Sequence, residues 1–291
     1  MMRGRTQMKT GQFDIMHTFE SAQPLTFFGD YDYSRKEITY PFMRRLVRVD
    51  RFGRVLEGQG AAVKDDVARR FRINEDIGKI YSGISTDGFM RDSIKEYTGM
   101  RLTHNLPWET TLVFILSQFN NVKRIRAITK RLMERYGDPV FDSEGNRAGN
   151  GVPGPEALSS AKVGDLMSCG TGFRAKYLIS AAEYCSSSLD LDSLSGKDYP
   201  SIKNELMEID GVGDKVADCI ALMGYGKLEA FPIDTWIKRL VEAVYFRGRK
   251  RSPRRIHEFA SERWGAYAGY AQQYIFWYGR SWWKTWTSKN R

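Results

Sequence analysis

The stretch that decides the fold is NELMEIDGVGDKVADCIALMGYGKLEAFPIDTWIKRL, residues 204–240. Apolar residues recur at helical spacing in residues 202–209 and again in 214–224, and Gly211-Val212-Gly213 lies between these two segments. Glycine accepts left-handed or crowded backbone that a side chain would block. The pattern therefore predicts a helix–hairpin–helix over residues 202–224, whose hairpin amides and helix N-terminus can together bind a phosphate.

The charge of the chain indicates the kind of partner. Its 291 residues have a formal net charge of +10, and the pI is near 9.4. The contents of 42% hydrophobic and 27% charged residues are ordinary for a globular protein, so the positive excess is the unusual feature. It favours a polyanionic partner such as nucleic acid, although a merely basic surface explains the charge equally well.

The cysteines and histidines argue against a bound transition metal. Cys169, Cys185 and Cys219 have no metal-ligand spacing, and three cysteines are too few for a four-cysteine iron–sulfur cluster made by this chain alone. The three histidines are scattered and do not form a zinc pattern. We therefore expect no iron–sulfur cluster, and the small odd number of cysteines fits a reducing interior.

The sequence contains no targeting segment that we can identify. No apolar run approaches the length of a membrane span, and the first residues, MMRGRTQMKTG, lack the apolar core of a signal peptide. We expect an intracellular protein, cytoplasmic with the nucleoid or nuclear, that works as a monomer without contact to a membrane.

Strand-like patterns occur in the first quarter of the chain. Residues 1–18 are a polar and basic lead-in. Residues 25–28 and 67–73 have β-prone patterns, and residues 44–57 predict a hairpin with Gly53 in its turn. Together they predict a small antiparallel sheet.

Helical patterns follow after residue 74, interrupted by a loop rich in Gly, Asp, Asn and Pro at 137–156. With Asn74 or Asp76 as the first cap, helices are predicted up to residue 82 and over 87–97, 107–118, 122–136, 173–185, 256–264 and 267–286. We therefore predict an α+β protein, with an N-terminal antiparallel β-sheet domain over residues 1–74 and a mainly helical domain over residues 75–291.

Lys215 is the first candidate for chemistry. It lies in the first turn of the helix after the hairpin, where the positive end of the helix dipole disfavours another positive charge. Partial burial would also favour the neutral amine, which is the nucleophile that forms Schiff bases with sugar aldehydes. The alternative is a solvated lysine that pairs with Asp218 or binds a phosphate.

Cys219 and Asp234 are candidates for the surroundings of Lys215. Cys219 is one turn after Lys215, so we expect it to line the same pocket as a contact and not as a nucleophile. Asp234 precedes an apolar helix and has the position of an N-cap. A capped carboxylate can stabilise an oxocarbenium ion or deprotonate a nucleophile, but capping alone also explains the residue.

These residues resemble a known family. The hairpin I-x-G-V-G-x-K-V-A-D-C, followed about twenty residues later by F-P-I-D, is similar to the HhH-GPD superfamily of DNA glycosylases, and in particular to the 8-oxoguanine DNA glycosylase/AP lyases. The resemblance extends from about residue 19 to residue 280. It implies a two-lobed helical glycosylase domain, a damaged base in double-stranded DNA as the substrate, and no required cofactor.

The resemblance also implies roles for the pocket residues. Lys215 would displace the damaged base from C1′ and become a Schiff base, from which β-elimination nicks the strand 3′ to the lesion. Asp234 would be the catalytic aspartate. The base pocket would contain Gln272 at the Watson–Crick edge of the flipped base and Phe276 on its face, with contacts from Cys219 and from the carbonyl of Ala22.

Further implied positions lie on the DNA-binding side. The backbone at Gly211, Val212 and Gly213 would contact phosphates, and the carbonyls of Met207, Ile209 and Val212 would hold a monovalent cation that bridges the hairpin to DNA. Phe173 would be a wedge in the base stack. Asn121, Arg124 and Arg174 would face the base left unpaired, although a phosphate contact is the default for a single arginine.

Several residues depart from the family's pattern. Phe119 replaces the first of three successive asparagines, and Ala22 stands where the family has a glycine. Trp236 occupies a frequent histidine position, and Asp210 replaces a proline. The first two departures leave the preferred lesion and the preferred opposite base open.

Three functions remain after the sequence is read. The first is a bifunctional glycosylase/lyase for an oxidised purine. The second is a monofunctional glycosylase for alkylated or deaminated bases, in which water is the nucleophile and Lys215 is incidental. The third is a non-catalytic DNA-binding module that uses the hairpin for phosphate contact only.

Overall fold

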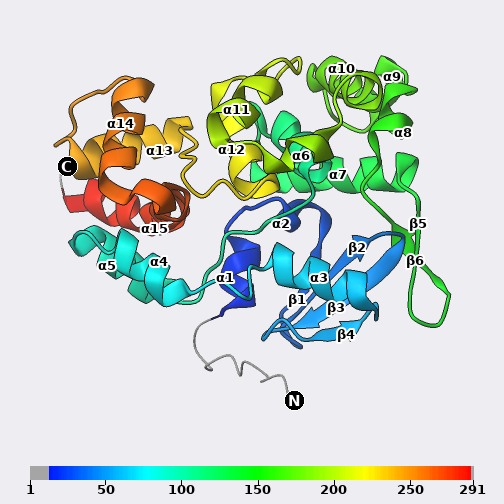
Figure 1. The fold of residues 1–291 in the computed structure, drawn as a ribbon, viewed down its shortest axis with the longest axis horizontal. Helices are drawn as coiled ribbons and strands as arrows, with labels where there is room; N and C mark the ends of the chain where they lie inside the picture. Colours follow the sequence, from blue (N-terminus) through cyan, green and yellow to red (C-terminus); the bar gives the residue numbers. More distant parts are fainter. Residues whose placement is uncertain (1–12, 290–291) are drawn as a thin grey trace.

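The computed structural model describes residues 13–289 and has a β-sheet at one corner of the molecule and helices over the rest (Figure 1). The sheet has six strands in the order β1-β2-β3-β5-β6, and β4 also pairs with β3. The strand bounds are β1 Asp30–Asp32, β2 Glu37–Phe42, β3 Arg45–Asp50, β4 Val55–Glu57, β5 Pro139–Phe141 and β6 Arg147–Asn150.

The helices follow one another in three groups along the chain. The N-terminal helices are α1 Ile15–Glu20, α2 Leu25–Phe28 and α3 Ala61–Arg70. The next are α4 Ile77–Ile84, α5 Gly88–Glu96, α6 Pro107–Ser117, α7 Val122–Tyr136, α8 Pro155–Ser159, α9 Val163–Ser168 and α10 Arg174–Ser187. The last are α11 Tyr199–Met207, α12 Asp214–Gly224, α13 Thr235–Tyr245, α14 Pro253–Trp264 and α15 Ala268–Lys289, with 3₁₀ turns at Leu191–Gly196 and Gly265–Tyr267.

Most of the helices form two lobes, one above the sheet and one beside it in the view of Figure 1. Figure 1 shows α6 to α12 on one side and α4, α5 and α13 to α15 on the other. Helix α6 is buried on nearly all sides, as its continuous apolar run predicts. The α+β class, with an N-terminal sheet followed by helices, is therefore confirmed.

Several local predictions agree with the structure because they depended on neighbouring residues. The β3–β4 turn contains Gly53 at φ +75°, where an added side chain would meet Ile73. Asp76 and Asp87 cap α4 and α5 through their side chains. Helix α7 has the predicted bounds, residues 122–136.

Four local predictions are wrong. Residues 25–28 are helix α2, and residues 67–70 are the end of helix α3. The expected loop over 137–156 contains β5 and β6, where the amide of Phe141 donates to the carbonyl of Arg44. In each case a contact with a distant segment decides the conformation. The lead-in over residues 1–18 is partly helix α1, and residues 1–12 lie outside the described range.

A buried ion cluster explains why residues 61–70 form a helix. Asp66 and Arg70 are one turn apart on the face of α3 that packs on the sheet, and both are buried. The Arg70 guanidinium bonds to Asp66 at 3.1 Å and to Glu109 of α6 at 2.9 Å. It also lies 4.8 Å from the centroid of the Tyr40 ring. Burial alone would lower the pKa of Arg70, but Glu109 and Asp66 raise it above its usual value.

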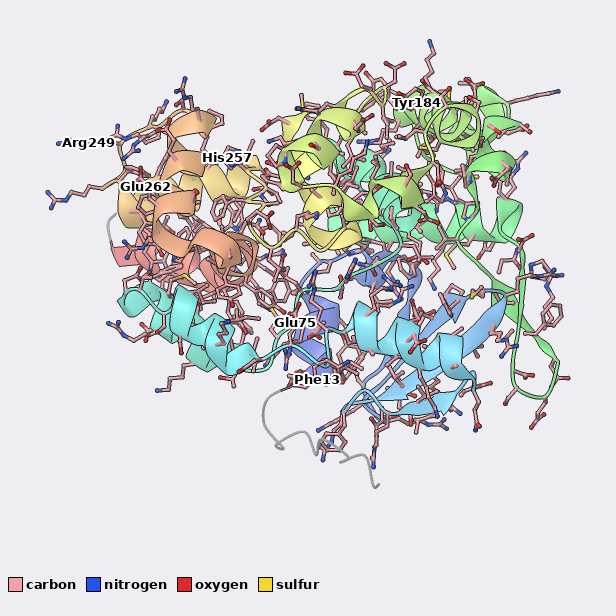
Figure 2. The ribbon with its side chains drawn as sticks, viewed as in Figure 1. Phe13, Glu75, Tyr184, Arg249, His257 and Glu262 are labelled. Atoms are coloured by element: carbon pink, nitrogen blue, oxygen red, sulfur yellow. The ribbon has the colours of Figure 1, made fainter. Side chains whose placement is uncertain are left out.

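A hydrogen bond joins the C-terminal helix to the N-terminal part of the chain. The Tyr270 hydroxyl of α15 donates to Glu75 at 2.8 Å, which ties the last helix to the segment after α3; Glu75 is labelled in Figure 2.

Within residues 13–289, none of the helices combines the length and the apolar character that a membrane span needs.

We predict that Arg70→Ala lowers the free energy of unfolding by about 3–5 kcal/mol, because Glu109 would stay buried without a counter-ion and Asp66 would keep only Arg69. Urea unfolding followed by circular dichroism measures this. Arg35→Ala is the control, since Arg35 is exposed in a turn and pairs with Asp32 at 3.8 Å. A loss for Arg70→Ala no larger than for the control would show that the cluster does not stabilise the fold.

Candidate active site

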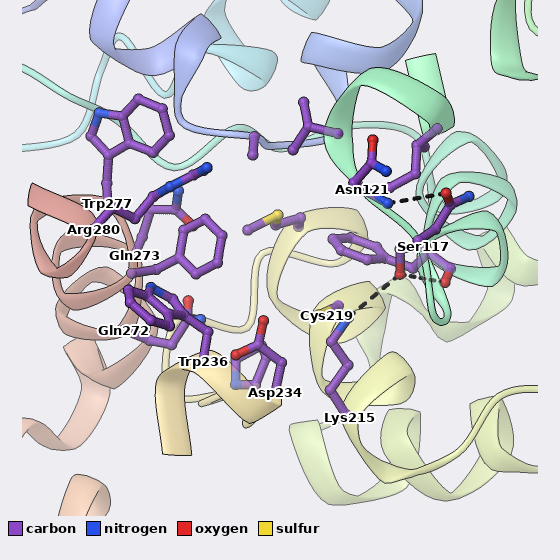
Figure 3. A pocket seen from close by; sticks show the side chains of 18 of the residues that line it. Ser117, Asn121, Lys215, Cys219, Asp234, Trp236, Gln272, Gln273, Trp277 and Arg280 are labelled. Carbon is purple, nitrogen blue, oxygen red and sulfur yellow. Dashed lines mark hydrogen bonds between the residues drawn. The ribbon is translucent and has the colours of Figure 1, made fainter. Parts of the chain in front are cut away.

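A cavity of about 1030 Å³ lies between the two helical lobes. The α6–α7 segment and α12 line one side, and the start of α13 together with α15 lines the other. Ala22 and Phe27 of the N-terminal segment complete the wall. Figure 3 shows Lys215, Cys219 and Asp234 near one another, with Gln272 and Trp277 projecting from α15.

Lys215 enters the cavity from the first turn of α12. Its Nζ is 3.5 Å from Ser117 Oγ and 5.2 Å from the centroid of the Phe114 ring, and the side chain is half-buried. Both neighbours belong to α6, so packing between α6 and α12 sets the direction of the amine. Within residues 13–289 no carboxylate lies within ion-pair distance of this amine.

The alternative pairing of Lys215 with Asp218 is wrong. Asp218 is buried on another face of α12, where Lys203 lies 2.7 Å from its Oδ1 and the Tyr199 hydroxyl donates to the same atom at 2.5 Å. Burial raises the pKa of the Asp218 carboxyl, while Lys203 and Tyr199 oppose that change. Asp218 thus takes part in the packing of α11 on α12. It does not pair with Lys215, whose side chain lines the cavity.

Cys219 lies one turn below Lys215 and lines the cavity, as predicted. Burial raises the pKa of its thiol to about 12, and the nearby Lys215 ammonium offsets only part of this rise. A thiol with such a pKa is protonated at neutral pH and is a poor nucleophile. The residue can therefore serve as a contact.

Asp234 is the N-cap of α13, also as predicted. Its Oδ1 accepts a hydrogen bond from the amide of Ile237 at 2.6 Å, and its backbone is extended. The cap fixes the direction of the carboxylate, and the residue lines the same cavity as Lys215. Capping and access to the cavity therefore coexist in one side chain.

Helix α15 presents Gln272 and Phe276 to the cavity from successive turns. The Oε1 of Gln272 is buried and has no hydrogen-bond partner among the described residues. An orphaned buried acceptor of this kind needs a donor, and a ligand can supply one. The neighbouring Gln273 has a different task, because its Nε2 donates to the carbonyl of Ser21 at 2.7 Å.

Sequence reasoning missed the outer part of this cavity. Trp277, Arg280, Trp283 and Lys284 of α15 and Trp236 of α13 also line it. The signal was present, since positions 276, 280, 283 and 284 repeat at helical spacing along the face that begins at Gln272. Trp236 and Trp283 make an edge contact with ring centroids 5.6 Å apart.

The hairpin depends on Gly211 for close packing. Gly211 has φ +82°, and a Cβ there would lie 2.6 Å from the Tyr177 ring of α10. Its carbonyl accepts a hydrogen bond from Gln118 Nε2 at 2.9 Å. Gly213 is exposed, and a Cβ there would meet open space. The hairpin therefore packs through its first glycine and leaves the second accessible.

The carbonyls expected to hold a cation belong to the same turn. Ile209 O already accepts a hydrogen bond from the amide of Val212 at 2.9 Å. Asp210, which the sequence left unexplained, accepts a hydrogen bond from Ser180 of α10 at 3.0 Å. The hairpin is thus tied to α10 at two adjacent residues, Asp210 and Gly211.

The structure corrects the role expected of Arg174. The side chain is only 3% exposed, and its guanidinium donates to the carbonyls of Gln118, Phe119 and Thr171. Four of its five N–H groups are engaged in this way, because a second contact to Gln118 completes the set. Arg174 therefore holds a loop and is not available to read a base.

The other predicted DNA contacts lie at the surface. Phe173 is exposed directly before α10, and Arg124 is exposed in the first turn of α7. Asn121 is the N-cap of α7, with its Oδ1 accepting from the amide of Arg124 at 3.0 Å, and it also lines the cavity.

The hairpin with its exposed Gly213, and the lysine in the cavity beside it, define a helix–hairpin–helix protein built around a cavity large enough for a small-molecule or nucleotide ligand. Residues 112–266, more than half of the chain, match the model of the HhH-GPD superfamily base excision DNA repair proteins. The chain belongs to this superfamily, as its sequence predicted.

Relatives and solved structures agree with this assignment. A probable N-glycosylase/DNA lyase of Methanothermobacter thermautotrophicus is 41% identical over 118 residues, which span 40% of this chain and 38% of that relative. The structure of MBOgg1 in complex with a low-affinity DNA ligand has a TM-score of 0.84 at 32% identity and covers 96% of this chain and 99% of that one. The Clostridium acetobutylicum 8-oxoguanine glycosylase/lyase, in complex with double-stranded DNA containing cytosine opposite 8-oxoguanine, has a TM-score of 0.84 at 27% identity over 93% of each chain.

We predict opposite effects for the two hairpin glycines. Gly211→Ala should lower the melting temperature, because its methyl group would overlap the Tyr177 ring and its φ disfavours any side chain. Gly213→Ala should leave the melting temperature nearly unchanged but weaken binding to duplex DNA, since its methyl group would occupy the space that a phosphate needs. Thermal unfolding and fluorescence anisotropy test the pair, and equal effects of both variants in both assays would contradict this division.

Proposed function

We propose that this chain is a DNA glycosylase with AP-lyase activity that flips an oxidised purine of the 8-oxoguanine type out of duplex DNA and excises it. The observation on which the proposal rests is the half-buried amine of Lys215 in the same cavity as Asp234. Membership of the superfamily supports base excision as the reaction class. The substrate named for the Clostridium acetobutylicum structure supports an oxidised guanine.

Lys215 is the nucleophile of the proposed reaction. Its neutral amine attacks C1′ of the flipped nucleotide, and the bond from C1′ to the base breaks as the base leaves with the electron pair. Opening of the sugar ring then converts the adduct into a protonated Schiff base. Removal of a proton from C2′ expels the 3′ phosphate oxygen, which nicks the strand 3′ to the lesion.

Asp234 acts on charge that develops during the first step. Its carboxylate is held by the Ile237 amide, so it need not reorganise when positive charge appears at C1′. The same carboxylate can accept a proton from the attacking amine. Both roles need only the fixed direction that the cap provides.

The base is recognised on the other side of the cavity. Gln272 offers its unpartnered Oε1 to a donor on the Watson–Crick edge of the base. Phe276 stacks on the face of the base, Cys219 contacts it from α12, and the carbonyl of Ala22 contacts its edge. Ala22 has φ +59°, a conformation that non-glycine residues rarely adopt, so its backbone direction is imposed by the surrounding structure.

The DNA backbone is held at the hairpin. The backbone of the hairpin at Gly211, Val212 and Gly213 contacts phosphates, with Gly213 as its exposed residue, and the carbonyls of Met207, Ile209 and Val212 hold a monovalent cation that bridges to DNA. Arg124 and Asn121 face the strand opposite the lesion, with Phe173 as a wedge in the base stack. No cofactor takes part in the reaction.

The proposal extends to the organisation of the protein. Residues 1–74 form the N-terminal domain and residues 75–291 form the glycosylase domain, although β5 and β6 of the second part complete the sheet of the first. The protein binds damaged double-stranded DNA as a monomer in the compartment that contains the DNA.

We predict that borohydride traps a covalent complex between the protein and DNA containing 8-oxoguanine, and that Lys215→Ala abolishes trapping because the proposed Schiff base forms on the Lys215 amine. Denaturing gel electrophoresis measures the complex. Lys123→Ala, which removes an exposed lysine in the first turn of α7, is the control and should still be trapped. Base release without trapping would favour the monofunctional alternative, and binding without base release would favour the non-catalytic one.

We predict that Gln272→Ala and Phe276→Ala reduce excision about tenfold or more while affinity for undamaged duplex stays within about twofold, since each contact exists only with a flipped base. Single-turnover base release and anisotropy give the two quantities. Equal losses in both assays would remove these residues from the base pocket.

A further inference from the structure

Two carboxylates and an imidazole meet at α12, outside the cavity. Asp214 and Asp218 are one turn apart on α12 and therefore share a face of the helix. His257 of α14, labelled in Figure 2, reaches the same face, and one ligand atom from each of the three side chains lies within 4.8 Å of the other two. The lining of the cavity includes none of these residues, so the cluster is separate from the candidate active site.

The spacing of the three ligand atoms is that of ligands around one metal ion. Nε2 of His257 lies 3.5 Å from Oδ2 of Asp218 and 3.7 Å from Oδ2 of Asp214. Metal bonds of about 2.0–2.2 Å at tetrahedral angles place two ligand atoms about 3.3–3.6 Å apart. A hydrogen bond between nitrogen and oxygen is only about 2.7–3.2 Å long. Hydrogen bonding among these atoms therefore does not explain the arrangement.

A buried oxygen of Asp218 points into this cluster without a partner. The Asp218 side chain is 0% exposed, and its Oδ2 faces Nε2 of His257. Both atoms are buried and lack a hydrogen-bond partner among the described residues. A buried polar atom without a partner destabilises the fold, and an ion that binds both atoms removes this cost.

The neighbouring Lys203 occupies only half of each carboxylate. Its Nζ is 2.7 Å from Oδ1 of Asp214 and 2.7 Å from Oδ1 of Asp218. The ammonium thus contacts one oxygen of each aspartate, and both Oδ2 atoms remain for another ligand. Two carboxylates and one ammonium leave a single negative charge beside the imidazole, so the cluster favours a further cation.

We propose that Asp214, Asp218 and His257 bind one divalent transition metal ion of the zinc type, which cross-links α12 to α14. An imidazole nitrogen suits zinc, whereas magnesium and calcium prefer oxygen ligands. The three side chains leave a fourth tetrahedral position, and Asp214, whose side chain is 57% exposed, gives water access to it. The ligands are side chains, unlike the hairpin carbonyls proposed for the monovalent cation, and the ion takes no part in base excision.

The sequence did not indicate this site because its ligands are not neighbours in the chain. The two aspartates have helical spacing, but His257 follows them only after α13 and the start of α14. The complete set of ligands therefore exists only in the folded chain. An ion that binds the folded state and not the unfolded state raises the melting temperature.

Isothermal titration of chelator-treated protein with Zn²⁺ tests the site. We expect one ion per chain, and a melting temperature about 3 °C or more higher at saturating Zn²⁺. His257→Gln should weaken Zn²⁺ binding about tenfold or more and remove this rise, because an amide keeps the polarity of the side chain but replaces the imidazole ligand. Asp214→Asn, at a more exposed position, should cause the same two losses.

Three controls separate the site from adventitious binding. His17→Gln removes a half-buried histidine of α1, and Cys185→Ser removes a partly exposed thiol. Both variants should keep the affinity for Zn²⁺ and the rise in melting temperature, which is measured within each variant and so does not depend on its own stability. Mg²⁺ in place of Zn²⁺ should not raise the melting temperature of the wild type.

Two outcomes would overturn the metal site. Equal Zn²⁺ affinities of the wild type and His257→Gln would show that zinc binds adventitiously to other groups. No Zn²⁺ binding by the wild type would show that a protonated His257 balances the two aspartates by itself. Neither measurement uses DNA, so the test is independent of the proposed function.

Discussion

The close contact between the Gly211 backbone and the Tyr177 ring is the constraint on which the functional part of the structure depends. A side chain at position 211 would overlap the ring, so the hairpin approaches α10 only because the residue is glycine. The hydrogen bond from Gln118 to the Gly211 carbonyl joins the α6–α7 loop to the same point. Three segments far apart in the chain therefore meet where α12 begins.

That meeting point determines the direction of Lys215. Because α12 begins directly after the hairpin, its first turn faces α6, and the amine comes to lie beside Ser117 and Phe114. The opposite face of α12 is occupied by a separate group of charges. Lys203 and Tyr199 both contact Oδ1 of Asp218, and His257 of α14, labelled in Figure 2, lies 3.5 Å from its Oδ2. The helix thus separates a charge-paired packing face from a face whose lysine has no carboxylate partner among the described residues.

The parts of the structure that the sequence predicted correctly depend on short-range rules. The two hairpin glycines, the caps at Asp87 and Asp234 and the amphipathic pattern of α7 each involve residues within one or two turns of one another. The errors at residues 67–73 and 137–156 have the opposite cause. Arg70 becomes a core residue only because Glu109 of α6 neutralises it, and β5 and β6 are strands only because β3 offers an edge to β5.

The sequence by itself determined the family and the helix–hairpin–helix, because the hairpin glycines and the helical periodicity on either side of them are local features. The roles of Lys215, Asp234, Gln272 and Phe276 came from the resemblance to that family and stay proposals. Only the tertiary structure decided that Arg174 is buried in the support of a loop while Phe119 is exposed at its tip. Nothing local distinguishes an arginine that binds DNA from one that holds backbone carbonyls. The difference depends on which distant carbonyls lie within reach once the lobes have packed, and that is a property of the folded chain.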